Sequence, residues 1–175
     1  MIMSSGVRKA ALTAHVTSSV GWLGAVAVFL AIAVAGVTSD QPETVRAAYI
    51  AMDLAASFVI VPLALASVTT GLIQALATHW GLARHYWVIV KLVITVVAAV
   101  VLLLQLDSIG YLADRATNDT VSGTDLGAAK SSLVVHAGGG LLVLLVPMVL
   151  SIYKPRGMTR YGQRRVRRPP AAAAS

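Results

Sequence analysis

Residues 88–106 read VIVKLVITVVAAVVLLLQL, and Lys91 is the only charged residue among these 19. A helix of about 20 apolar residues crosses the ~30 Å hydrocarbon layer of a bilayer, so this stretch has the length and composition of a transmembrane helix. Three further stretches, residues 20–37, 54–77 and 133–152, contain no Asp, Glu, Lys or Arg. The sequence therefore predicts four transmembrane helices.

Composition supports the same class. Of the 175 residues, 57% are hydrophobic and 12% are charged, whereas soluble domains have about 25% charged residues. The chain has no cysteine, which excludes disulfides and thiolate metal sites. We predict an all-α, integral membrane four-helix bundle over residues 1–153 and a basic, largely disordered tail over residues 154–175. The predicted helices occupy about residues 10–37, 43–78, 86–106 and 129–152.

The N-terminus is basic and then apolar, as in a signal peptide. Its apolar run continues to Val37, which is longer than the roughly 7–15 residues of a signal-peptide core. We therefore expect it to stay attached as the first helix.

Lys and Arg residues predict the orientation, because short cytoplasmic loops are rich in them. Eleven lie on the side of the two termini: Arg8, Lys9, Arg84, Lys91, Lys154, Arg156, Arg160, Arg164, Arg165, Arg167 and Arg168. Three lie on the other side: Arg46, Arg115 and Lys130. All seven acidic residues lie on or toward that second side. Both termini are therefore expected in the cytoplasm.

Two segments do not fit a simple span. A helix from Pro42 to Thr78 is ~57 Å long at 1.5 Å per residue, so it either projects from the bilayer or bends at Pro62. The outer segment 107–130 is polar and without strong periodicity, and we expect it to be a loop.

Small and polar residues mark the faces that helices turn toward each other in a membrane. The first helix offers His15, Ser19, Trp22, Val26 and Phe29. The second offers Asp53, Ser57, Ile60, Ala64, Ser67, Gly71, Gln74 and Thr78. The third offers Lys91, Thr95, Ala98, Leu102 and Gln105. The fourth offers His136, Gly140, Val143, Pro147 and Leu150. We expect these four faces to line the bundle interior.

Asp53 and His136 are candidates for a proton or ligand site. Asp53 lies ~10 Å inward of Arg46, and His136 lies ~9 Å inward of Lys130. Both distances are measured inward from the outer side of the membrane, so the two residues are expected at the same depth. A carboxylate and an imidazole there either form an interhelical bond that sets the helix register, or hold a proton or ligand.

Residues 78–91, THWGLARHYWVIVK, combine aromatic, basic and histidine side chains. Their position at the cytoplasmic turn predicts a lipid-interface role, because Trp and Tyr favour the headgroup level. The interface set is Trp80, Arg84, Tyr86, Trp87 and Lys91.

The remaining histidines raise the question of a cofactor. His15 is the only histidine elsewhere on the cytoplasmic side, so His15, His79 and His85 form the candidate set for haem b. A zinc site needs three or four protein ligands, and Asp53 with His136 supplies two. We therefore expect no metal site, no catalytic residue and, unless the histidine set binds haem, no cofactor.

The tail after Tyr153 is strongly basic. A basic segment that follows a transmembrane helix binds anionic lipid headgroups, and we expect this role rather than nucleic-acid binding. The other expected partners are the lipid bilayer itself and a second copy of the chain or another membrane protein.

Four motifs carry a family resemblance: HVTSSVGWLGAV (15–26), WGLARHYWV (80–88) with Lys91, VVHAGGG (134–140) and YKPRGMTRYG (153–162). They resemble a group of small bacterial four-helix integral membrane proteins that are catalogued as a domain of unknown function. The resemblance covers residues 12–162 and implies a bacterial plasma membrane. His15 with Gly21, Trp22 and Gly24 is more loosely similar to copper-resistance and cytochrome b561-type membrane proteins.

Three functions remain open from the sequence. The first is a non-enzymatic accessory or scaffold component of a membrane assembly. The second is a b-type haem or copper-handling protein that uses His15 with His79 or His85. The third is a small proton-coupled transporter that acts as an oligomer through Asp53 and His136.

Overall fold

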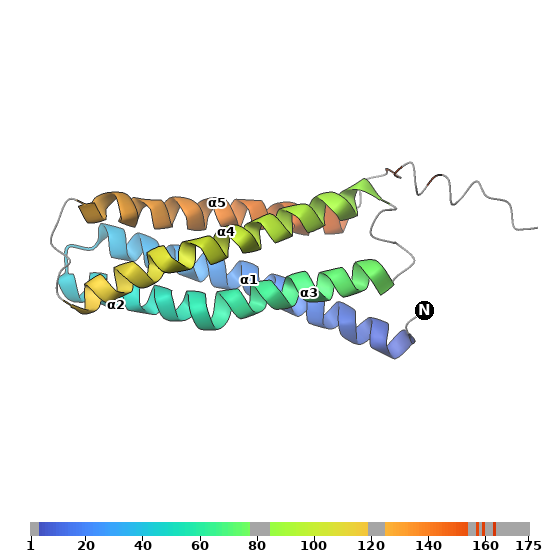
Figure 1. Cartoon of the computed structure of the whole chain (residues 1–175), viewed down its shortest axis with the longest axis horizontal. Coiled ribbons are helices and arrows are strands. Elements are labelled where there is room, and N and C mark those ends of the chain that lie inside the picture. Colours follow the sequence, from blue (N-terminus) through green and yellow to red (C-terminus); the bar gives the residue numbers. More distant parts are fainter. Residues whose placement is uncertain are drawn as a thin grey trace, which may run out of the picture.

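The computed structural model describes residues 4–77, 85–118 and 125–153, together with positions 157, 159 and 163; for residues 77 and 125–130 it describes the backbone. The helices are α1 (Ser5–Thr38), α2 (Pro42–Ala55), η1 (Ala56–Ile60), α3 (Val61–Ala77), α4 (Tyr86–Thr117) and α5 (Asp125–Tyr153). Figure 1 shows them as long rods that run side by side. The predicted all-helical fold is confirmed.

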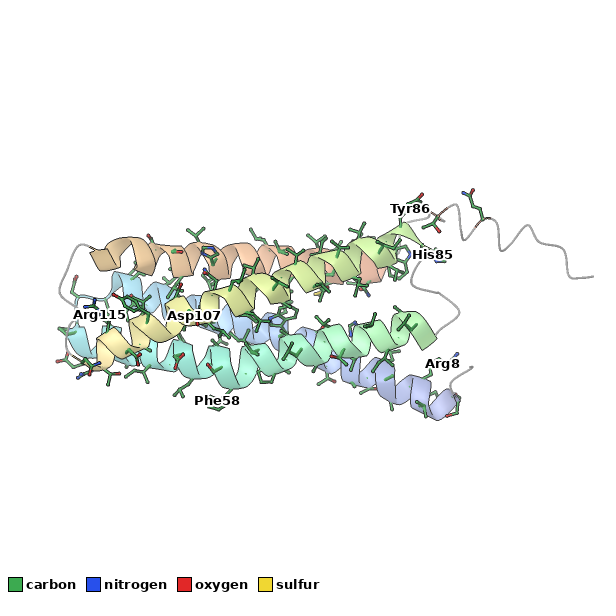
Figure 2. All side chains as sticks on the ribbon, in the orientation of Figure 1. Arg8, Phe58, His85, Tyr86, Asp107 and Arg115 are labelled. Atoms are coloured by element: carbon green, nitrogen blue, oxygen red, sulfur yellow. The ribbon has the colours of Figure 1, made fainter. Side chains whose placement is uncertain are left out.

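The helices α2, η1 and α3 form one continuous rod with a π-helical turn in its middle. The Val61 N–H donates to the Ala56 carbonyl, five residues earlier. Pro62 follows directly, and proline has no N–H and clashes with the carbonyl four residues before it. The wider π turn relieves this conflict without breaking the helix. Figure 2 shows Phe58 projecting from this turn, away from the bundle.

The bundle has four sides. Helices that follow each other in the chain pack together, and α5 closes the bundle against α1. The diagonal pairs are α1 with α4, and α2 with α5. We call the two ends of the bundle the Pro42 end, where α2 and α5 begin, and the Tyr86 end, where α1 and α4 begin (Figure 1).

In the described part of the chain, four rods are long and apolar enough to cross a membrane. They contain 34, 35, 32 and 23 residues, whereas a span needs about 20. The extra length allows part of the bundle to extend beyond an apolar layer.

The core confirms the predicted inner face of α1 and shifts that of the second rod. Trp22, Val26 and Phe29 are buried as predicted. In the second rod Ala56 is buried, whereas Ser57 is exposed. The extra residue in the π turn changes the rotation of the helix, so the heptad spacing that predicted Ser57 does not continue through it.

The predicted loop over residues 107–130 is wrong where the structure describes it. Helix α4 continues to Thr117, and α5 begins at Asp125. The continuation of α4 has one buried face, which contains Ile109, Leu112, Ala113 and Ala116. Its exposed acidic and basic residues had masked this face in the sequence.

Candidate functional site

His15 links α1 to α3 at the Tyr86 end. Its Nδ1 lies 3.1 Å from the Ser67 carbonyl oxygen and 3.2 Å from Thr70 Oγ1. The Thr70 hydroxyl donates to the Ala66 carbonyl at 2.6 Å, so toward His15 it can only accept. Nδ1 therefore carries the proton and donates to both oxygens, and Nε2 carries the lone pair.

Neighbouring groups complete this link between α1 and α3. Gly71 leaves room for the imidazole, because a Cβ at that position would lie 2.9 Å from His15 Cε1. The hydroxyls of Ser19 and Ser67 are 2.7 Å apart, and Gln74 Nε2 donates to the Ala11 carbonyl at 2.9 Å. Four polar side chains of the predicted inner faces therefore join the two helices.

Lys91 makes the corresponding link between α4 and α5. It is half-buried, and its ammonium donates to Ser151 Oγ at 3.1 Å. The Ser151 hydroxyl donates its own hydrogen bond to the Pro147 carbonyl at 2.7 Å. The ammonium also lies 5.5 Å from the centroid of the Trp87 ring, a cation–π geometry. Sequence reasoning had Lys91 reaching back to the lipid interface and missed Ser151 as its partner.

The structure describes only some residues of the candidate haem set and of the lipid-interface set. Figure 2 shows His85 and Tyr86 where α4 begins. Tyr86 is 55% exposed. His15 and His85 belong to opposite corners, because α1 and α4 are diagonal. His79, Trp80 and Arg84 lie outside the described residues.

Asp53 and His136 are not brought together, because α2 and α5 are diagonal. Asp53 is half-buried against α4, with Oδ1 3.8 Å from the Cβ position of Gly110. His136 bonds within its own helix, where Nδ1 donates to the Ser132 carbonyl at 2.7 Å. The two side chains therefore do not form the predicted carboxylate–imidazole pair.

The inner face of α5 includes the predicted Gly140 and Pro147, but Ala137 and Leu144 take the places predicted for His136 and Val143. His136 and Val143 are exposed. The buried residues are Leu133, Ala137, Leu144 and Pro147, with Gly140 half-buried. Because His136 satisfies Nδ1 on its own backbone, its polarity does not force it into the interior, and that polarity was the reason for the predicted face.

A groove opens between α4 and α5 near the centre of the bundle. Its volume is about 300 Å³, and α1 contributes Trp22, Val26 and Phe29 to its wall. The α4 wall includes residues 97–109, and the α5 wall includes residues 133–144. Gln105 and His136 are the residues with strongly polar side chains in an otherwise apolar lining.

The polar contacts described above join neighbouring helices to one another. They contain no group of three or more His, Asp or Glu side chains arranged to hold a metal. Comparison with protein-family models, with curated proteins and with solved structures finds no match to this chain. The fold and the polar links define a four-helix bundle with membrane-length apolar helices.

Proposed function

We propose that this chain is a multi-pass protein of a bacterial plasma membrane, with both termini in the cytoplasm. It acts there as a non-enzymatic accessory or scaffold component, together with further copies or a membrane-protein partner. The bacterial location rests on the family resemblance, and the orientation rests on the distribution of Lys and Arg. The scaffold role rests on the polar contacts described above.

The spacing of the polar groups supports insertion in a bilayer. Thr70 lies seventeen positions after Asp53, which corresponds to ~26 Å along the rod. This is close to the ~30 Å hydrocarbon thickness. Asp53 then lies near one boundary of the apolar layer, and the His15 and Lys91 links lie near the other.

The observation that supports the scaffold role is that polar side chains form hydrogen bonds between helices. His15, Gln74 and Lys91 each bond across to another helix. In a membrane, where apolar burial does not drive helix association, such bonds hold a bundle together. Side chains that fix helix positions in this way suit a rigid structural component.

The assembly state tests the proposal. The full chain is extracted from its native membrane in a mild detergent and its mass is measured by native mass spectrometry, with chemical cross-linking in intact membranes as a second measurement. We expect a complex larger than one copy, whose members are then identified by peptide mass analysis. A single copy in both measurements would contradict a scaffold role.

A further inference from the structure

The π turn between α2 and α3 leaves one backbone carbonyl without its helical donor. In a regular α-helix the Ser57 carbonyl accepts from the N–H of Val61, four residues later. In this rod the Val61 N–H donates to the Ala56 carbonyl instead, and the next residue, Pro62, has no N–H. The Ser57 carbonyl oxygen is therefore an acceptor that its own helix does not satisfy.

The side chain of the same residue is also unused. Ser57 is exposed, and its hydroxyl has no hydrogen-bond partner among the described residues. The hydroxyls of Thr70, Thr95 and Ser151, in contrast, each donate to a carbonyl of their own helix. Ser57 therefore presents an unpaired donor and an unpaired acceptor on the outer side of the rod.

These two groups lie within the apolar layer of the proposed membrane span. Ser57 follows Asp53 by four positions, which is about 6 Å further into the layer along the rod. Acyl chains neither donate nor accept hydrogen bonds, and an unpaired backbone group in hydrocarbon is costly. The Ser57 carbonyl and hydroxyl therefore require a polar partner that the surrounding lipid cannot provide.

An aromatic side chain lies beside the polar pair. Of the two phenylalanines in the chain, Phe29 is buried, whereas Phe58 is 75% exposed. Figure 2 shows Phe58 pointing away from the bundle. Pro62 is exposed as well. We call Ser57, Phe58 and Pro62 together the Ser57 patch.

We propose that a second copy of this chain covers the Ser57 patch. The patch is complementary to itself in charge, because the hydroxyl proton is partially positive and the carbonyl oxygen is partially negative. Around a two-fold axis, the Ser57 hydroxyl of each copy donates to the Ser57 carbonyl of the other. The two Phe58 rings pack beside these bonds and exclude lipid from them.

Insertion in a membrane favours this partner. Two copies with the same orientation carry Ser57 at the same depth, so a two-fold axis along the membrane normal brings the two patches together. The same surface then serves on both copies, as in most dimers, and both hydrogen bonds form at once. The inference rests on the proposed scaffold role and names the surface through which the copies associate.

Cross-linking tests which surface the copies share, because the chain has no cysteine of its own. Leu54 is 52% exposed and lies one turn before Ser57, and Leu142 is 67% exposed on α5, which is diagonal to this rod. On oxidation in intact membranes, we expect Leu54→Cys to form a disulfide-linked dimer of the chain. Leu142→Cys is the matched control, and we expect it to remain a single chain.

Variants of the patch test the two halves of the bond. Ser57→Ala removes both hydroxyls of the dimer, so we expect its dissociation constant in detergent to rise about tenfold. Ser57→Thr keeps the hydroxyl and should restore association. Pro62→Ala supplies the missing N–H to the rod, so it should also weaken the dimer. Analytical ultracentrifugation measures association, and an unchanged melting temperature at a concentration where every variant is a single copy checks the fold.

Several outcomes would overturn the inference. They are equal cross-linking at positions 54 and 142, unchanged association of both Ser57→Ala and Pro62→Ala, and cross-linking of Leu54→Cys to a different protein only. An assembly of copies that persists in both variants would leave the scaffold proposal intact and contradict this inference alone. A single copy in every measurement would contradict both.

Discussion

At the scale of single residues, His15 shows how an apolar bundle accommodates an imidazole. Its N–H is shared by the Ser67 carbonyl and the Thr70 hydroxyl, and Gly71 provides the space for the ring. The sequence placed His15 and Gly71 on facing sides of two helices but did not show that they touch. That contact depends on the rotation of α1 against α3, which single-chain periodicity specifies only to within a residue.

Gly71→Ala should destabilise the bundle. Its Cβ would lie 2.9 Å from His15 Cε1, so the ring must move and weaken its bond to Ser67. We expect a loss of about 1–2 kcal/mol in the free energy of unfolding, measured as a lower melting temperature in detergent. Gly24→Ala is the control, because no atom lies within 4 Å of its Cβ. Equal melting temperatures for the two variants would contradict the proposed contact.

At the scale of helices, Arg46 shows a role that the sequence did not reveal. The prediction of membrane orientation counted Arg46 only as one of three basic residues on the outer side. In the structure its Nε donates to the Ala116 carbonyl at 2.8 Å, and Nη2 donates to the Thr117 carbonyl. These carbonyls lie in the last turn of α4, where they lack partners within the helix and where positive charge is favourable.

Arg46→Met should therefore loosen the end of α4. The methionine keeps much of the apolar stem but removes both hydrogen bonds and the charge. We expect about 1–3 kcal/mol lower stability, with faster amide hydrogen exchange confined to residues 113–118. Exchange that is unchanged in this segment would show that the cap does not hold the helix end. Arg46→Lys, which keeps one charged donor, should show an intermediate effect.

The π turn limits prediction at the same scale. Heptad spacing correctly placed Ile60, Ala64 and Ser67 inside, and all three are buried. The same spacing placed Ser57 inside, and it is exposed. Pro62 was recognised as a point of bending, but a proline can be accommodated by a kink, a π turn or a break. The choice follows from packing on both sides of it.

At the scale of the whole molecule, the proposed orientation can be tested by labelling, because the chain has no cysteine of its own. Ser5→Cys lies at the Tyr86 end and Asp40→Cys at the Pro42 end, and both positions are exposed. With a thiol reagent that does not cross membranes, we expect intact cells to label Asp40→Cys only. Ser5→Cys should label after the membrane is opened. The reverse pattern would place the termini outside.

The sequence by itself determined the number of long apolar helices and the all-helical fold, because length and hydrophobicity act locally along the chain. The sequence also predicts a helix end where charge and hydropathy change together. It predicted the end of α4 wrongly over residues 107–117, because one face of the helix is buried there and the other is charged. Only the tertiary structure decided which polar groups meet. His15 joins Ser67, Lys91 joins Ser151, and Asp53 and His136 stay apart, since such contacts depend on the order, rotation and depth of whole helices.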